Sequence, residues 1–470
     1  MEINEFRRAG HELVDWMADY LKDVERLPIT PDVKPGDIRR SLPASPPQAA
    51  EPTEQLMNDF GRLILPGMTH WGHPGFFAYF PSNASPPSML AEMLTAALGA
   101  QCMSWQTSPA ATELEQVTME WLRQMLALPE GFTGVIQDTS STATLVALLT
   151  ARERATGFAA AIHGLQGVER RLTVYTSRER HSSVDKAVRL AGYGIESLRL
   201  IDLDDAYAMR PDALEQAIQA DIAQGLVPAV VVATTGTTGS TAIDPLRPIG
   251  EICRRHGIWL HVDASYAGTA AILPEKRWIL DGVEFADSFV FNPHKWMLVN
   301  FDCSAYFVKD VDALLRTFSA SPEYLRTAHD AEVANFRDWG IQLGRRFRAL
   351  KLWWVIKSYG VEGLQAILRR NCEWAESVAG WVRADSRFEL MAPVPLGLVC
   401  FRLRAREGED EAEVNERNRE LLARVNATRQ VYLSHTALDG RYTIRMAIGA
   451  RATEFRHVRE AWALIAATVE

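Results

Sequence analysis

The chain has 470 residues and a formal net charge of −9, and 47% of its residues are hydrophobic and 23% are charged. This composition is ordinary for a soluble globular protein with a large core, and the acidic balance argues against binding to nucleic acid. No run of 18 apolar residues is present, and the charged segment from Met1 to Ala9 lacks the apolar core of a secretory signal. We therefore expect neither a membrane span nor secretion.

The cysteines are five in number and form no Cys-x-x-Cys motif. An odd count without that motif indicates neither a disulfide framework nor a zinc site, so we expect no bound metal. A reducing, cytoplasmic location follows as the default expectation.

The first 85 residues have a helical and proline-rich pattern. Residues 4–26 place apolar side chains at three- and four-residue spacing, which predicts an amphipathic helix. The stretch from Pro28 to Pro52 contains seven prolines, which disfavours regular helix and central strand, and a second helical pattern runs from Thr53 to Leu65. These segments build little core alone, so we expect residues 1–85 to wrap a partner subunit; packing on the same chain is the alternative.

Strand and helix patterns alternate over residues 86–360, which predicts a large α/β domain with a mainly parallel sheet. Helical patterns such as Ser183–Leu190 and Pro211–Ile222 separate the strands. Neither GxGxxG nor a P-loop motif is present, so a dinucleotide or nucleoside triphosphate site is not supported. The expected strands are Leu172–Thr176, Ala229–Thr234, Trp259–Val262, Ser288–Phe291 and Ala305–Val308.

Residues 361–470 change character and predict a small C-terminal α+β domain. Two apolar segments of this part read as strands and three periodic segments read as helices. The expected strands are Gly397–Leu403 and Tyr442–Ile448, and the expected helices are Val361–Ala384, Glu413–Val425 and Glu454–Val469.

Polar side chains follow four of the expected strands at the point where each ends. Ligands of open α/β sheets bind beyond the carboxyl ends of the strands, so we expect these side chains to meet at one sheet edge. Each has an ordinary structural interpretation by itself: a buried histidine, a turn threonine, a helix-capping aspartate or a surface lysine. The residues are His181, Thr238, Asp263, Asn292, His294 and Lys295.

A lysine and a carboxylate at neighbouring strand ends suit pyridoxal phosphate. The amine of Lys295 can form a Schiff base with the aldehyde, and Asp263 can keep the ring nitrogen protonated. The hydroxyl-rich segment 136–144 precedes the helical run Leu145–Arg152, and a helix start of this kind binds phosphate well. Plain helix capping is the alternative interpretation of that segment.

The chain resembles the group II pyridoxal phosphate-dependent amino acid decarboxylases, in particular those specific for aromatic L-amino acids. The resemblance extends over essentially the whole chain. It implies the aspartate-aminotransferase type of fold (fold type I) and an obligate homodimer whose active sites lie at the subunit interface. The motifs that carry it are His70-Trp71, Phe77–Pro81, Ser108–Glu115, His181–Val184, His261–Ala264, Asn292–Trp296, Asn300–Ser304 and Leu343–Arg348.

The same resemblance implies the roles of individual residues. Lys295 binds the cofactor aldehyde, Asp263 pairs with the ring nitrogen, and His181 stacks on the ring. Tyr324, on a loop spanning about residues 318–337, protonates the α-carbon after CO₂ has left. The residues of the phosphate and cofactor environment are Ser140, Ser141, Asn292 and His294. Thr238 lies close to the ring.

An aromatic wall near the motif Phe77–Pro81 suits a substrate ring. Gly344 matches a position where relatives accepting indole or catechol rings carry Gly, whereas many tyrosine- or histidine-preferring relatives carry Ser. Several positions depart from the animal enzymes, namely Ser82, Gln101, Met103, Asp138 and Ser265. The substrate-binding residues that we expect are Trp71, Tyr79, Phe80, Pro81, Ser82, Met103 and Gly344.

These observations predict decarboxylation of an aromatic L-amino acid, of the tryptophan, 5-hydroxytryptophan, L-DOPA, tyrosine or phenylalanine class, to the arylalkylamine and CO₂. The first alternative is an aromatic aldehyde synthase, in which the loop tyrosine or the ring-stacking histidine is replaced. Tyr324 and His181 therefore favour amine formation. The second alternative is a non-catalytic paralogue, which the retained Lys295 and Asp263 disfavour.

Overall fold

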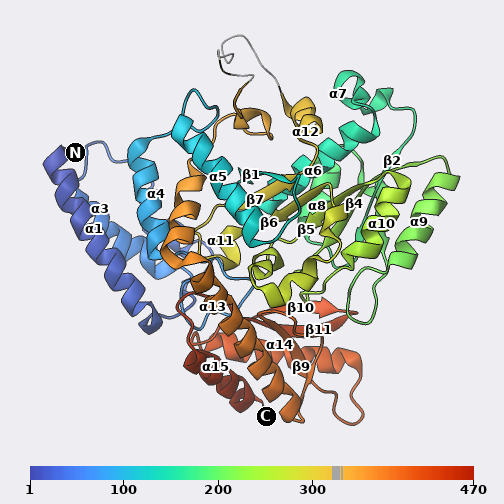
Figure 1. Ribbon diagram of the computed structural model, residues 1–470. Coiled ribbons are helices and arrows are strands. Elements are labelled where there is room, and N and C mark those ends of the chain that lie inside the picture. Colours follow the sequence, from blue (N-terminus) through green and yellow to red (C-terminus); the bar gives the residue numbers. More distant parts are fainter. Residues whose placement is uncertain (320–328, 330–331, 470) are drawn as a thin grey trace.

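The computed structural model describes residues 1–319, 329 and 332–469, whose helices surround two sheets (Figure 1). The larger sheet has seven strands in the order β1-β7-β6-β5-β4-β2-β3. The strands from β3 to β6 pair in parallel, whereas β7 is antiparallel to both β6 and β1, which confirms the mainly parallel sheet. Their bounds are β1 (Thr133–Gln137), β2 (Leu172–Ser177), β3 (Leu198–Ile201), β4 (Val227–Thr234), β5 (Trp259–Asp263), β6 (Ser288–Phe291) and β7 (Ser304–Val308).

Helices cover both faces of the larger sheet, which explains why its central strands are apolar on both sides. Val230 and Val232 of β4 belong to one core, and Val231 and Ala233 belong to the core on the opposite face. The first core includes side chains of α6 (Ser140–Ala155), α8 (Ser182–Leu190) and α12 (Val311–Phe318). The second includes side chains of α5 (Pro109–Met125), α9 (Pro211–Ala223), α10 (Leu246–His256) and α13 (Arg348–Ala384).

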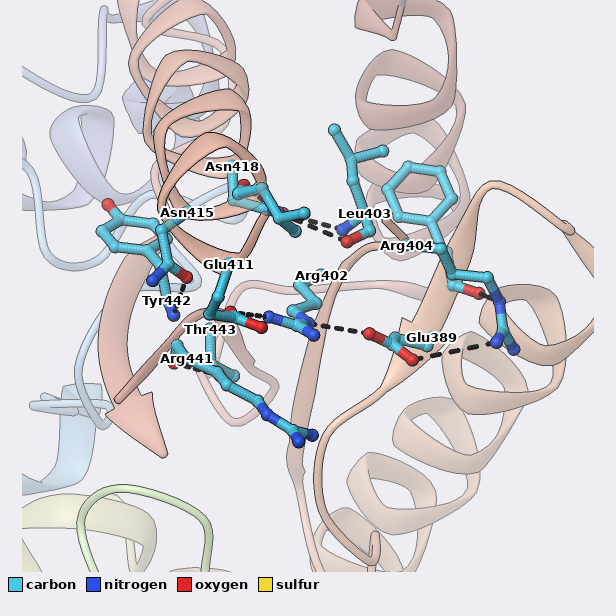
Figure 2. Close-up of polar contacts among 12 residues, drawn as sticks. Glu389, Arg402, Leu403, Arg404, Glu411, Asn415, Asn418, Arg441, Tyr442 and Thr443 are labelled. Carbon is cyan, nitrogen blue, oxygen red and sulfur yellow. Dashed lines mark hydrogen bonds and ion pairs between the residues drawn. The ribbon is translucent and has the colours of Figure 1, made fainter. Parts of the chain in front are cut away.

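The smaller sheet is antiparallel, in the order β10-β11-β9-β8, and lies below the larger sheet in Figure 1. Arg402 of β9 is only 5% exposed, and its guanidinium donates to Glu389 of β8 (2.7 Å) and to Glu411 of α14 (Figure 2). These charge-assisted bonds tie α14 to the sheet. The bounds are β8 (Phe388–Leu390), β9 (Leu398–Leu403), β10 (Ser434–Leu438), β11 (Arg441–Ala447), α14 (Glu411–Ala427) and α15 (Phe455–Thr468).

The N-terminal segment forms helices along one side of the molecule (Figure 1). These are α1 (Ile3–Asp23), α2 (Asp37–Ser41), α3 (Thr53–Asp59) and the π-helical turn Phe60–Ile64, followed by α4 (Pro86–Leu98). Ala9 is the one buried residue of α1, although the helix has the amphipathic pattern that the sequence predicts. The expectation of no helix in the proline-rich stretch is wrong at α2. The run from Gly36 to Leu42 is free of proline, and the Asp37 carboxylate accepts the Lys34 N–H (2.7 Å) at its start.

Several boundaries differ from the sequence prediction. Strands β1, β3, β8 and β10 were not predicted, and α13 begins at Arg348 rather than at Val361. The backbone of α13 leaves the helical region at Gly360 (φ 63°, ψ 169°), where a residue without Cβ is favoured. The domain boundary that we predict after residue 360 coincides with this break. Within the described residues, no helix combines the length and apolarity that crossing a membrane requires.

Candidate active site

The side chains expected at the strand ends line one cavity at the carboxyl edge of the larger sheet. Asp263 is the last residue of β5, and Lys295 lies on the short helix α11 (Pro293–Trp296) that follows the neighbouring strand β6. The cavity has a volume of about 190 Å³. It is lined by Phe80, Thr139, Ser140, Ser141, His181, Thr234, Gly236, Thr238, Asp263, Ser265, Tyr266, Asn292, His294 and Lys295. All eight residues that the sequence predicts to contact the cofactor are among them.

The amine of Lys295 is poised to be neutral more readily than an ordinary lysine. Desolvation by the surrounding protein lowers its pKa, and the positive charge of Arg445 acts in the same direction, while Asp263 opposes the shift. The free base of an amine is the form that attacks a carbonyl. The Asn83 side chain donates to the Lys295 carbonyl and to that of Gly449 (both 2.9 Å), which fixes the backbone that carries the amine.

Asp263 is a buried carboxylate, 3% exposed, at the end of β5. The Ser265 N–H donates to Asp263 Oδ1 (3.1 Å), and the Ser265 hydroxyl donates to the same oxygen. No hydrogen bond to Oδ2 is formed by any residue of the described chain. A carboxylate arranged in this way can accept a hydrogen bond from a protonated ring nitrogen.

His181 lies at the N-cap of α8 and is held through one ring nitrogen. The N–H of Ser183 (3.2 Å) and its hydroxyl (2.8 Å) both contact His181 Nδ1. Because a backbone N–H can only donate, Nδ1 is the acceptor and Nε2 carries the proton of the neutral ring. Burial lowers the pKa of His181, which favours this neutral form. A neutral, fixed imidazole is suited to stacking on an aromatic ring.

The start of α6, a helix of 16 residues, contributes Ser140 and Ser141 to the lining of the cavity. Its first N–H groups have no partner within the helix and attract an anion such as a phosphate. The hydroxyls of Ser140 and Ser304 both donate to Asn292 Oδ1 (2.6 Å each). His294 Nδ1 accepts the Cys303 N–H (2.9 Å), and burial lowers the pKa of His294 to about 4, so its ring is neutral. The hydrogen-bond donors in this part of the cavity are therefore hydroxyls and N–H groups.

Most of the predicted substrate residues lie outside this cavity. Phe80 lines it, with its ring stacked on Tyr266 (centroids 3.9 Å apart). Trp71 and Tyr79 are exposed and stack on each other at 5.6 Å. The other members are buried Pro81, half-buried Ser82 and Met103, and exposed Gly344. Tyr324 lies outside the described residues.

Sequence reasoning missed several residues that build the site. Tyr266 lies three residues after Asp263 in the turn after β5, between the rings of Phe80 and Trp296, whereas Ser265 was named only as a departure from the animal enzymes and its contact with Asp263 was not foreseen. Asn83 lies two residues after the motif Phe77–Pro81, so proximity to that motif was the available signal. Thr139, Thr234, Gly236 and Ser304 were also missed.

The groups that line the cavity fit pyridoxal phosphate. They combine an amine of lowered pKa for the aldehyde, a buried carboxylate for the ring nitrogen, a neutral imidazole for the ring face and a helix start for the phosphate. No cluster of side chains suited to a metal ion is found in the described part of the chain.

The comparisons with known proteins agree with this fit. The chain matches the pyridoxal-dependent decarboxylase conserved domain over residues 35–404. It is 47% identical to the aromatic-L-amino-acid decarboxylase of Sus scrofa, covering 98% of this chain and 96% of that protein. It is 46% identical to the phenylacetaldehyde synthase of Arabidopsis thaliana, covering 99% and 96%. The structure of Oryza sativa TDC with PLP and tryptamine superposes with a TM-score of 0.96 at 41% identity, covering 100% of this chain and 98% of that one. The chain therefore belongs to the pyridoxal-dependent decarboxylase family, and its cofactor is pyridoxal phosphate.

Proposed function

We propose that the protein is a carboxy-lyase that converts an aromatic L-amino acid to the corresponding arylalkylamine and CO₂. One observation carries the proposal: Lys295, Asp263 and His181 line a single cavity at the carboxyl edge of the sheet. These groups are the ones that pyridoxal phosphate chemistry requires, and the relatives named above include a decarboxylase of aromatic amino acids. A non-catalytic paralogue has no need to retain all three.

When bound, pyridoxal phosphate supplies an electron sink for the charge that remains at the α-carbon after CO₂ leaves. Lys295 holds the cofactor through its amine, whose lowered pKa makes the free base more available. Asp263 keeps a proton on the ring nitrogen, because an adjacent carboxylate favours the protonated form. We assign His181 to the face of the cofactor ring, where its neutral imidazole would stack and orient the cofactor.

The phosphate end is held by the start of α6. We assign Ser140 and Ser141 to the phosphate, through their two backbone N–H groups and the hydroxyl of Ser141. Two serine hydroxyls hold the Asn292 side chain, and the Cys303 N–H holds the His294 ring. Both side chains therefore have a fixed orientation in the cavity. Thr238, in the loop after β4, lines the cavity, and we assign it to the side of the cofactor ring.

We assign the substrate ring to the aromatic side chains of the strip that contains Phe80. Phe80 lines the cavity itself, and we assign Trp71 and Tyr79, which are exposed and stack on each other, to the same wall. Pro81 and Ser82 continue this strip of chain. We assign Met103 and Gly344, which lie outside the cavity of one chain, to the wall that a partner subunit completes. With Trp71, Tyr79, Phe80, Pro81 and Ser82, they make up the seven proposed substrate-binding residues.

The protein is accordingly a homodimer, with residues 1–85 as its dimerisation segment, residues 86–360 as the cofactor domain and residues 361–470 as the small domain. Support comes from apolar side chains that α1 and α4 leave exposed, among them Phe6, Leu94 and Leu98 (59%, 45% and 65% exposed). Their area is better buried against a second copy than left in water. The five free cysteines support a cytoplasmic location.

A second candidate function is aromatic aldehyde synthesis, because one relative at 46% identity carries that name. The two reactions separate at the α-carbon: a proton gives the amine, whereas oxygen leads to the aldehyde. We assign Tyr324 as the proton donor, which favours the amine.

Product analysis in air tests both functions. Purified enzyme is incubated with a panel of aromatic amino acids, and amine, aldehyde, ammonia and peroxide are measured by mass spectrometry and coupled assays. The wild type should form amine almost exclusively, and Tyr324→Phe should lose amine yield and gain aldehyde. Aldehyde as the main wild-type product would establish the second candidate, and normal amine formation by Tyr324→Phe would remove Tyr324 from the mechanism.

A further inference from the structure

Ser265 donates two hydrogen bonds to the side-chain carboxylate of Asp263. It lies two residues after Asp263, in the turn that leaves β5, and it lines the cavity. Its N–H (3.1 Å) and its hydroxyl both donate to Oδ1 of that carboxylate. Two donors on one oxygen restrict rotation of the carboxylate about its bond to Cβ.

The backbone of Ser265 is itself fixed to the neighbouring strand. The Asn292 N–H donates to the Ser265 carbonyl (3.0 Å), and the Ala264 N–H donates to the Val290 carbonyl (2.9 Å). The turn after β5 is therefore joined to the segment that leads to Lys295. The hydroxyl of Ser265 holds Asp263 in a fixed relation to the lysine that anchors the cofactor.

The second oxygen of Asp263 is left for the cofactor. Among the residues that the structure describes, none donates a hydrogen bond to Oδ2, although the carboxylate is buried. The ionisable groups around it are His261 on the same strand, His181 before α8 and Lys295 on α11, and their charges act on Asp263 or respond to it. A ring N–H therefore has one available acceptor here, and its direction is set by Ser265.

The two hydrogen bonds to Oδ1 also affect whether the cofactor ring nitrogen keeps its proton. They hold the carboxylate beside the ring nitrogen, and an adjacent negative charge favours the protonated form of that nitrogen. The side-chain donor is the Ser265 hydroxyl, which acts together with the backbone N–H of the same residue.

We propose that Ser265 is a positioning residue for the cofactor: its hydroxyl aligns Asp263 so that Oδ2 binds the ring nitrogen, and it keeps the proton on that nitrogen. The inference rests on the assignment of Asp263 to the ring nitrogen and needs no particular substrate.

The test uses the full-length enzyme and pyridoxal phosphate labelled with ¹⁵N in the ring. The ¹⁵N chemical shift reports protonation of the ring nitrogen, and fluorescence titration gives the cofactor dissociation constant. Ser265→Ala should raise that constant by about tenfold, the ratio expected for loss of one charge-assisted hydrogen bond, and should move the ¹⁵N signal towards the unprotonated value. Ser265→Thr, which keeps the hydroxyl, should restore both.

A double-mutant cycle with Asp263→Asn separates positioning from packing. In the Asp263→Asn background, Ser265→Ala should change neither readout further. Equal ¹⁵N shifts for wild type and Ser265→Ala would overturn the proposal, and so would an undiminished effect of Ser265→Ala in the Asp263→Asn background. Neither measurement involves substrate, so a failure here is distinct from a failure of the proposed decarboxylation.

Discussion

Replacement of Gly344 by serine is predicted to change ring selectivity while leaving the fold intact. A Cβ added at Gly344 meets Gln101 Nε2 at 3.2 Å, and this atom ends a flexible side chain. A movement of a few tenths of an ångström relieves the contact, and the backbone at Gly344 does not require glycine. The cost to stability is therefore small, and the added group must occupy space beside the proposed ring wall.

The magnitude follows from the size of the change. Gln101 Oε1 accepts the Arg345 N–H (2.7 Å), so the amide is anchored and its Nε2 can hold the introduced hydroxyl in place. One extra group in an apolar pocket changes discrimination by about 1–3 kcal/mol. We expect the ratio of kcat/KM for tryptophan to kcat/KM for tyrosine to fall by about tenfold, with L-DOPA between them.

The assay is a comparison of kcat/KM for the three amino acids in wild type, Gly344→Ser and the double variant Gln101→Ala/Gly344→Ser. Removing the Gln101 amide gives the hydroxyl room to turn away, so the double variant should recover part of the lost ratio. Unchanged ratios in a folded Gly344→Ser enzyme would show that residue 344 does not line the substrate site, and the aromatic wall would then end at Phe80 and its neighbours.

Three further predictions concern the chemistry, the core and the assembly. Lys295→Ala should abolish turnover, and borohydride reduction of the native enzyme should label one lysine per chain; a label on any lysine other than Lys295 would refute its role. Glu115→Ala should lower the free energy of unfolding by about 3–5 kcal/mol in urea titration, because buried Arg345 (2.6 Å away) loses its carboxylate partner; Glu115→Gln, which keeps an acceptor, should cost less, and equal losses would contradict this reasoning. Deletion of residues 1–85 should abolish the dimer in sedimentation with cofactor present, and a stable, fully active dimer would refute the wrapping of the partner.

The sequence predicted the part of the fold in which every residue is buried. Strands β4, β5 and β6 are buried over most of their length, and apolar residues such as Val230–Val232 and Phe289–Phe291 form short runs in their sequences. The missed strands lack this pattern. Leu198–Ile201 is half-exposed at the edge of the sheet, and in Ser434–Leu438 the central residues are exposed or half-buried, including His435. Such strands form because a neighbour offers hydrogen bonds, which one segment of sequence does not show.

The site was predictable to the extent that each residue follows a strand. The topology then brought residues such as His181 and Lys295 to one edge, as expected for parallel strands. The bridges between them were not predictable. Asp138 accepts the Thr139 N–H (2.5 Å) and the Gln342 side-chain N–H (2.8 Å), which joins the start of α6 to a segment 204 positions further along the chain. Side-chain direction decides such contacts, and periodicity does not determine it.

We assign the proposed reaction to three separate parts of the chain. Activation of the cofactor depends on groups at the ends of β5 and β6, where Asp263, Ser265 and Lys295 are joined by hydrogen bonds and charge. Both amine formation and aldehyde formation need those groups, so they do not distinguish the two products. Ring selection depends on the wall that includes Phe80, and the fate of the α-carbon depends on the proton donor that we assign as Tyr324. Variants at the three places should therefore act on different observables: cofactor binding, the ratio of kcat/KM between substrates, and the ratio of amine to aldehyde.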